Sequence, residues 1–290
     1  MQIQSDLREH LAADPRRYSA VLLDIDGTLL AAGRAIANAA LLVEGLRRNR
    51  IPFVLLTNDG NHSPEEKAAG LRRAGVPVLP REIVSCSEAN KDYVRERRIR
   101  GAQVFVMGDL GVPCHARRAG LRPTRRLAEL DRCAGIIVGE AHYEWESVIN
   151  GVINSLMRNP RRFMLVPNPD SYWPSDRPNE VAIGAGGVAR LIQTILREYG
   201  ITYEPVYLGK PNPAIYRRAL RHLLERHAIA GPIRSSRVLA VGDNLRSDIL
   251  GGNRMGFTTA LVLTGVTAAH HLDQPGHGRD VRPVLVFKHL

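Results

Sequence analysis

Continuous apolar runs alternate with amphipathic segments at both ends of the chain. Four runs have the length and composition of buried strands: residues 18–24, 51–56, 238–241 and 259–263. Between the first two, apolar side chains recur at helical spacing: Ala39, Leu42, Val43 and Leu46. Strand, helix and strand in that order predict a parallel unit, so we expect an open parallel sheet flanked by helices.

A second set of elements interrupts this pattern in the middle of the chain. Strands are predicted at residues 103–107, 135–138 and 163–166, with a helix from about Glu144. A further helix, residues 188–199, has a predicted apolar face: Val188, Leu191, Ile192, Ile195, Leu196 and Tyr199. We therefore expect an inserted, smaller α/β domain at residues 100–204, within a core formed by residues 1–99 and 205–290.

Local signals place several boundaries of these elements. Ser63-Pro64-Glu65-Glu66 predicts a capping box and a helix with proline at its first position. Ser85-Cys86-Ser87-Glu88 predicts a second capping box at the start of another helix. Residues 206–208 predict a short strand with which the chain returns to the core.

Composition is that of a globular protein. Of the 290 residues, 44% are hydrophobic and 24% are charged, and no apolar stretch approaches the roughly 18 residues of a membrane span. The N-terminal residues lack the apolar centre of a secretory signal, and the three cysteines (Cys86, Cys114, Cys133) show no metal-binding spacing. We expect a cytoplasmic α/β protein with no membrane partner.

The formal net charge of +11 raises the question of nucleic-acid binding. Arginine pairs supply much of the charge, but they are scattered over many predicted helices and loops. Aromatic residues make up only 5% of the chain, which leaves few stacking platforms for bases. We expect a solvated basic surface that attracts small anionic substrates, and no nucleic-acid partner.

Polar residues that could carry chemistry follow three predicted strands: Asp24 with Asp26, Thr57 with Asn58, and Asp243 with Asp248. The carboxyl ends of parallel strands share one edge of the sheet, where ligands bind, so these distant segments are predicted to converge. Carboxylates suit Mg²⁺, and a carboxylate can attack a phosphate monoester only where a metal and a cation neutralise charge. Lys210, in Gly209-Lys210-Pro211, is the predicted cation.

The neighbours of Asp24 fit general acid and base chemistry. Asp26 could protonate the leaving oxygen and then take a proton from water. Gly27 allows the backbone to turn, and Thr28 could support the loop. Thr57 and Asn58 could donate hydrogen bonds to phosphoryl oxygens.

Together these segments resemble the four motifs of the haloacid dehalogenase superfamily, in order: Asp24-Ile25-Asp26-Gly27-Thr28-Leu29, Thr57-Asn58, Gly209-Lys210-Pro211 and Gly242-Asp243-Asn244-Leu245-Arg246-Ser247-Asp248-Ile249. The large insertion and the segment Asn168-Pro169-Asp170 resemble the branch of capped 4-nitrophenylphosphatase-like and phosphoglycolate-phosphatase-like enzymes, subfamily IIA.

The resemblance implies a Rossmann-like catalytic core, an α/β cap and a phosphatase that forms an aspartyl-phosphate on Asp24. It implies Mg²⁺ held by Asp24, the Asp26 carbonyl and Asp243, with Asp248 nearby. It also implies a small phosphorylated metabolite as substrate and a homodimer formed through the cap. Asp59 departs from the usual motif and adds charge beside the phosphate contacts, and Trp173 falls in the segment expected to contact substrate.

Three alternatives remain open at this point. A phosphotransferase or mutase would use the same core, and a non-enzymatic anion-binding protein would use the basic surface. Gly184-Ala185-Gly186-Gly187-Val188-Ala189 fits a dinucleotide-binding pattern, but the apolar run before it is only three residues long. Hydrolysis is favoured, because Asp26 next to the nucleophile suits activation of water.

Overall fold

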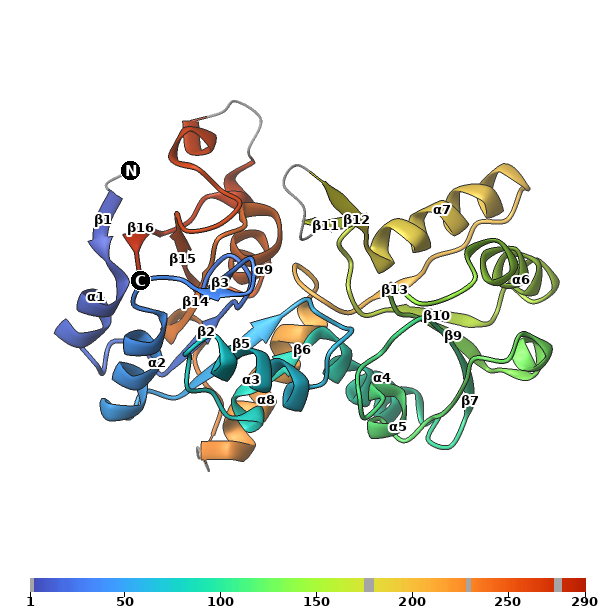
Figure 1. Cartoon of the computed structure of the whole chain (residues 1–290), viewed down its shortest axis with the longest axis horizontal. Coiled ribbons are helices and arrows are strands. Elements are labelled where there is room, and N and C mark those ends of the chain that lie inside the picture. Colours follow the sequence, from blue (N-terminus) through green and yellow to red (C-terminus); the bar gives the residue numbers. More distant parts are fainter. Residues whose placement is uncertain (1–2, 175–179, 228–230, 274–277) are drawn as a thin grey trace. The chain divides into compact units, whose positions relative to one another are not determined.

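The computed structural model describes residues 3–174, 180–227, 231–273 and 278–290, and it divides into two compact units (Figure 1). Unit 1 comprises Met1–Thr57, Pro64–Val84 and Lys210–Leu290, and unit 2 comprises Asn58–Ser63 and Ser85–Gly209. Each unit contains its own parallel sheet with helices packed beside it. The predicted α/β fold class is therefore confirmed.

Unit 1 is built on a seven-stranded sheet in the order β1-β16-β15-β14-β2-β5-β6. Its strands are β1 (Ile3–Asp6), β2 (Ala20–Leu23), β5 (Phe53–Thr57), β6 (Ile83–Ser85), β14 (Val238–Gly242), β15 (Thr258–Val262) and β16 (Leu285–His289). The pairings from β1 to β5 are parallel, with Leu23 of β2 opposite Val241 and Leu55. The central strands are buried on both faces, which explains their uninterrupted apolar sequences.

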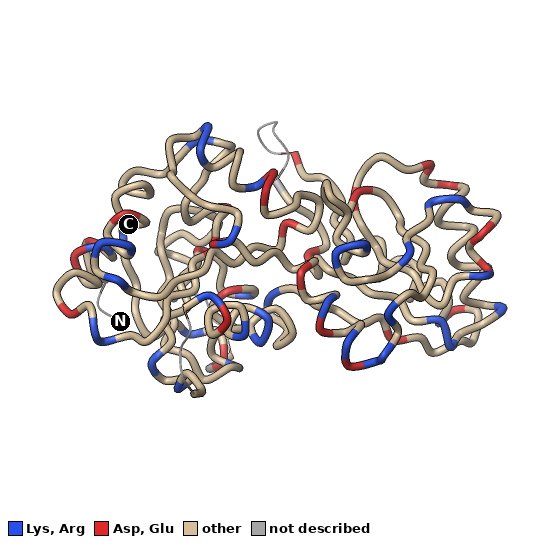
Figure 2. The backbone as a smooth tube through the Cα atoms, turned by 90° about the horizontal axis from the view of Figure 1, so that it is seen from below, with Lys and Arg blue, Asp and Glu red and all other residues tan. Residues whose placement is uncertain are grey.

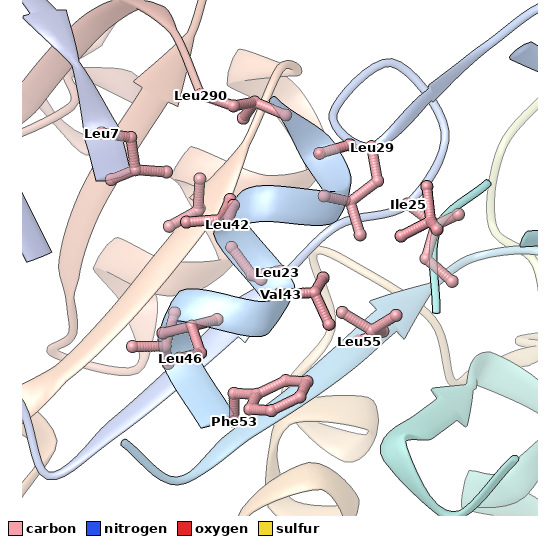
Figure 3. Packing of buried hydrophobic residues seen from close by; sticks show 14 of the residues in the cluster. Leu7, Leu23, Ile25, Leu29, Leu42, Val43, Leu46, Phe53, Leu55 and Leu290 are labelled. Carbon is pink, nitrogen blue, oxygen red and sulfur yellow. The ribbon is translucent and has the colours of Figure 1, made fainter. Parts of the chain in front are cut away.

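The helices of unit 1 are α1 (Leu7–Ala13), α2 (Ala39–Arg48), α3 (Pro64–Arg73), α8 (Pro213–His227) and α9 (Leu250–Arg254). Short helical turns complete it: η1 (Pro80–Glu82), η4 (Ser235–Arg237), η5 (Leu245–Ile249), η6 (Ala269–Asp273) and η7 (Arg279–Val281). The predicted apolar stripe of α2 is confirmed, since Leu42, Val43 and Leu46 are buried in one cluster with Leu23 and Phe53 of the sheet (Figure 3). The strands β3 (Leu30–Ala31) and β4 (Arg34–Ala35) form a small antiparallel hairpin.

The first elements of the chain were not predicted from the sequence. Strand β1 pairs with β16 at the sheet edge, with Ile3 opposite Val286, and α1 buries Leu7 and Leu11. Each element is too short for its periodicity to stand out from a polar segment, so only the tertiary pairing identifies it.

Unit 2 contains a five-stranded parallel sheet in the order β13-β10-β9-β7-β8. Its strands are β7 (Gln103–Met107), β8 (Arg122–Thr124), β9 (Gly135–Val138), β10 (Phe163–Val166) and β13 (Val206–Tyr207). The helical segments are η2 (Cys86–Ala89), α4 (Asn90–Arg97), α5 (His115–Arg118), η3 (Leu127–Arg132), α6 (Trp145–Arg158) and α7 (Ala185–Glu198). An antiparallel hairpin of β11 (Tyr172–Pro174) and β12 (Val181–Ile183) precedes α7.

The predicted apolar face of α7 was too wide. Val188, Ile192 and Leu196 are buried, whereas Leu191 is 41% exposed and Tyr199 is 68% exposed. The buried residues recur every four positions, which is the narrow stripe that one helix presents to one packed surface, and Leu191 and Tyr199 lie beside this stripe.

Three further predictions differ from the structure. Strand β13, expected in the first sheet, pairs with β10 in the second. The capping box at Ser85 is only half formed: Ser85 Oγ accepts a bond from the Ser87 amide, but Glu88 instead forms an ion pair with Lys91 and lies 3.3 Å from His115 Nδ1. Residues 85–99, expected with the core, also belong to unit 2.

Charged residues are spread along the whole backbone of both units. Figure 2 shows Lys and Arg interleaved with Asp and Glu over many elements. Within the described part of the chain, no helix has the length and hydropathy needed to cross a membrane.

Candidate active site

Three buried carboxylates meet at the carboxyl end of the central strands of unit 1. Asp24 follows β2, Asp243 follows β14, and Asp248 lies in η5. They are 7%, 2% and 4% exposed, and one oxygen of each lies within 4.8 Å of the others. The backbone amide of Asp24 donates to the carbonyl of Val241 at 2.9 Å, which sets the two strand ends side by side. The convergence predicted from the strand ends is present.

Lys210 lies between two of these carboxylates. Its Nζ is 2.6 Å from Asp24 Oδ1 and 2.7 Å from Asp248 Oδ1, and the residue is 3% exposed. A buried ammonium needs such partners, because an unpaired charge away from water is costly. The predicted cation therefore contacts the predicted nucleophile directly.

The site carries more negative than positive charge. Burial, opposed by Lys210, raises the pKa of Asp24, and the charges of Asp248 and Asp243 raise it further. Burial and the charge of Asp248 raise the pKa of Asp243 to about 6. Burial alone would lower the pKa of Lys210, but Asp24 and Asp248 outweigh it and raise the pKa. A further cation would relieve the repulsion among the carboxylates.

Glycine allows the backbone to approach these carboxylates closely. Gly27 has a φ of +84°, and a Cβ there would lie 2.2 Å from Asp243 Oδ2. A Cβ at Gly265 would lie 2.0 Å from the same oxygen. The Val266 amide donates to Asp243 Oδ2 at 2.7 Å, and Thr264 Oγ1 donates to the carbonyl of Gly27 at 2.8 Å. The predicted turn at Gly27 is present, and residues 264–266 lie against Gly27 and the Asp243 carboxylate.

Asp26 is more accessible than the other carboxylates, with its side chain 58% exposed. Lys67 of α3 holds it, with Nζ at 2.8 Å from Oδ2 and 3.2 Å from Oδ1. Thr57 Oγ1 donates to Asp26 Oδ2 at 3.4 Å. An accessible carboxylate with a fixed orientation has the properties that proton transfer to and from substrate requires.

Lys67 and residues 264–266 were not predicted from the sequence. Lys67 carries no signal, since a lysine one turn into a helix is usually a surface residue. Thr264 and Gly265 did carry a signal, because they follow strand β15, the neighbour of β14. The rule that located Asp24 and Asp243 at strand ends applies equally to them.

Four further residues were singled out in the sequence: Thr28, Asn58, Asp59 and Trp173. Thr28 is fully buried beside Gly27, and its hydroxyl has no hydrogen-bond partner among the described residues. Asn58, Asp59 and Trp173 belong to unit 2. Asp59 Oδ1 accepts from the Asn61 and His62 amides at 3.0 and 3.2 Å, and Trp173, on β11, is 38% exposed. Contact of these residues with a substrate stays a prediction.

The acidic cluster has the donor set of a hard cation. Asp24, Asp243 and Asp248 offer oxygen atoms alone, as Mg²⁺ and Ca²⁺ prefer. Both oxygens of Asp248 are engaged, since Oδ1 accepts from Lys210 Nζ at 2.7 Å, and Oδ2 accepts from Ser247 Oγ at 3.2 Å and from the Asn244 amide at 3.3 Å. Asp24 and Asp243 are therefore the better candidates for direct ligands.

Comparison with known proteins agrees with this geometry. A family model described as haloacid dehalogenase-like hydrolase matches residues 21–122, and one described as HAD-hydrolase-like matches residues 207–290. Ribonucleotide monophosphatase NagD of Escherichia coli (strain K12) is 31% identical over 254 residues, 87% of this chain and 90% of that protein. Dihydroxyacetone phosphatase of Corynebacterium glutamicum (strain R) is 28% identical over 247 residues, 85% of this chain and 81% of that protein.

A solved structure of p-nitrophenyl phosphatase from Archaeoglobus fulgidus superposes with a TM-score of 0.78 at 25% identity, covering 94% of this chain and 96% of that one. The chain belongs to the haloacid dehalogenase-like hydrolase family, in subfamily IIA, the branch that contains NagD and the 4-nitrophenylphosphatases. The family membership predicted from the four motifs is confirmed.

Proposed function

We propose that this protein is a divalent-metal-dependent phosphatase that hydrolyses a small phosphomonoester, with Asp24 as the nucleophile and Mg²⁺ as the ion. The observation that carries this proposal is the buried group of Asp24, Lys210 and Asp243 in unit 1. A nucleophilic carboxylate, a cation in contact with it and a second carboxylate for a metal are the parts that phosphoryl transfer to an aspartate requires.

Each residue has a defined step in this reaction. Asp24 Oδ attacks phosphorus while the bond from phosphorus to the ester oxygen breaks, and Asp26 donates a proton to that departing oxygen. Asp26 then takes a proton from water, which attacks the phosphorus of the aspartyl-phosphate and releases inorganic phosphate and free Asp24. Lys210 orients Asp24 and favours its ionised form, and Thr57 and Asn58 hold phosphoryl oxygens. A metal ion held by Asp24, the Asp26 carbonyl and Asp243 would neutralise charge on the phosphoryl group.

The substrate class follows from what the relatives share. NagD is named for ribonucleotide monophosphates and the Corynebacterium glutamicum relative for dihydroxyacetone phosphate. Both compounds are small organic phosphomonoesters. We propose that unit 1 acts as the catalytic core and that unit 2 contains the cap that gives substrate selectivity, with Trp173 as one contact. The homodimer expected through this cap stays a prediction.

The first test measures phosphate release from dihydroxyacetone phosphate, nucleoside 5′-monophosphates, glycerol phosphate and 4-nitrophenyl phosphate. We expect release with excess Mg²⁺ and its loss after chelation, with recovery when Mg²⁺ is restored. Release that is equally fast in chelator would contradict the metal requirement. No release from any ester would contradict the phosphatase proposal.

The raised pKa of Asp243 makes the stability of the metal-free protein depend on pH. A pKa of about 6, above the ordinary 3.8, means that the folded state holds the proton more tightly, so stability falls as pH rises from about 4 to about 6. Asp243→Asn removes this dependence. Between pH 5 and pH 7.5 the native protein should therefore lose about 1.4 kcal/mol of stability that the metal-free variant does not lose, so the melting temperature of the variant relative to native should rise by a few degrees.

Binding of Mg²⁺ should reverse this difference in melting temperature between the variant and the native protein. At pH 7.5 Mg²⁺ is expected to raise the melting temperature of the native protein more than at pH 5, because the ligand carboxylates must be ionised. The Asp243→Asn variant should gain much less. Equal Mg²⁺ stabilisation of both proteins at pH 7.5 would exclude Asp243 as a ligand.

A further inference from the structure

Unit 2 contains a buried carboxylate that the proposed reaction does not use. Glu140 follows β9 and is 7% exposed. Among the described residues no Lys, Arg or His pairs with it. Three donors bind it instead: Asn168 Nδ2 at 2.8 Å and the Ala185 amide at 3.1 Å to Oε1, and Asn61 Nδ2 at 2.7 Å to Oε2. Burial raises the pKa of Glu140, and these donors oppose that rise.

The three donors come from three different segments. Asn61 belongs to Asn58–Ser63, the segment that follows Thr57, and Asn168 to the loop after β10. Ala185 is the first residue of α7, where an orphan amide and the positive end of the helix favour an anion. One carboxylate therefore fixes three backbone segments of unit 2 to each other.

The network continues from Glu140 to Asn58. Asn168, held by Glu140, accepts a bond from the Asp170 amide through its Oδ1 at 2.9 Å. Asp170 Oδ2 then accepts from Asn58 Nδ2 at 3.0 Å. The carbonyl of Asn58 accepts from Cys86 Sγ at 3.1 Å, which fixes its backbone. The side-chain amide of Asn58 is thus oriented by a chain of hydrogen bonds that begins at Glu140.

The glycine-rich pattern at residues 184–189 has a role in the same network. A Cβ at Gly186 would lie 2.0 Å from the carbonyl oxygen of Pro169, and one at Gly184 would lie 2.4 Å from that of Asp170. These glycines let the loop at residues 168–170 rest on the first turn of α7. Close packing accounts for the pattern without a dinucleotide.

We propose that Glu140 is a positioning residue for phosphate recognition: its carboxylate holds Asn61 and Asn168, and through Asp170 it sets the orientation of the Asn58 amide. This inference rests on the proposed function, in which Asn58 holds a phosphoryl oxygen. Glu140 does not touch the substrate in this proposal.

Glu140→Gln is the direct test, because glutamine keeps the shape but has one acceptor oxygen. Whichever way its amide lies, an N–H group faces at least one of the three donors. We expect kcat/KM to fall about tenfold, a typical effect of a lost charge-assisted hydrogen bond. The matched control is Glu146→Gln, since Glu146 is exposed at the start of α6; it should stay within about twofold of native.

A double-mutant cycle separates positioning from general destabilisation. If Glu140 acts through Asn58, the double variant Glu140→Gln/Asn58→Ala should have the kcat/KM of Asn58→Ala alone, within about twofold. Amide hydrogen exchange of residues 58–63 should be faster in Glu140→Gln than in native protein. Asn168→Ala, which leaves the carboxylate in place but breaks its link to Asp170, provides a second variant with the same expected non-additivity if Glu140→Gln does not fold.

The outcomes separate this inference from the proposed function. Losses that multiply in the double variant, or an unchanged kcat/KM in Glu140→Gln, overturn the positioning role while turnover by the native enzyme still supports the phosphatase. Absence of turnover in the native protein overturns the proposed function, and the positioning role with it.

Discussion

Replacing Asp24 by asparagine is expected to lower kcat for phosphomonoester hydrolysis by at least about 10⁴-fold, because an amide cannot serve as the nucleophile. The fold should survive. The introduced asparagine has nearly the same volume as the buried aspartate, and its oxygen can still accept a bond from Lys210, which lies 2.6 Å from Asp24 in the native protein. The melting temperature in chelator should therefore stay within a few degrees of native.

Steady-state phosphate release measures the loss, and rapid acid quenching followed by peptide mass spectrometry locates the phosphoryl group. We expect a phosphorylated peptide containing Asp24 in the native protein and none in Asp24→Asn. Asp280→Asn, at an exposed position in η7, is the matched control and should turn over like native. Residual turnover above about one tenth of native in Asp24→Asn would remove Asp24 from the nucleophilic role.

Replacing Lys210 by methionine is expected to damage both activity and stability. The variant loses the cation that contacts Asp24 and Asp248, and it leaves buried carboxylates with less compensation. Breaking a buried ion pair on one side costs about 3–5 kcal/mol of unfolding free energy. Losing a preorganised charge at the reacting group lowers kcat/KM by about 10³-fold. Denaturant unfolding in chelator and steady-state kinetics measure the two effects.

A second substitution distinguishes charge balance from packing. Lys210→Met/Asp248→Asn removes one cation and one anion, so it should recover much of the stability but none of the activity. Lys288→Met, at an exposed position on β16, is the control for the loss of a lysine. If Lys210→Met is as stable as native in chelator, the ion pairs of Lys210 contribute nothing to the fold.

Long elements and strand-end residues could be predicted from the sequence alone. Strands β7, β9 and β10 have the bounds that their apolar runs indicated, and α2 buries the predicted stripe. These predictions succeed because periodicity and burial are properties of a few consecutive residues. Asp24 and Asp243 were located by the same logic, since every parallel strand presents its carboxyl end to one edge of the sheet.

Contacts between segments distant in sequence could not be predicted in the same way. Glu88 fitted a capping box, but the side chain of His115, 27 positions later, lies 3.3 Å from its carboxylate. Strand β13 was predicted to begin the return of the chain to the core, yet it pairs with β10 in the sheet of unit 2. In each case a short local signal allowed two partners, and packing selected one of them.

The sequence by itself determined the alternation of strands and helices, the order of the four motifs and the residue types that phosphoryl transfer needs. Those properties are local or depend on the common edge of a parallel sheet. Only the tertiary structure decided that Lys67 pairs with Asp26 and that Gly265 and Val266 lie against the Asp243 carboxylate. It also decided that Glu140 joins three segments of unit 2. Hydrogen bonds and ion pairs act over about 3 Å, so the identity of a partner depends on how the chain packs and not on distance along the sequence.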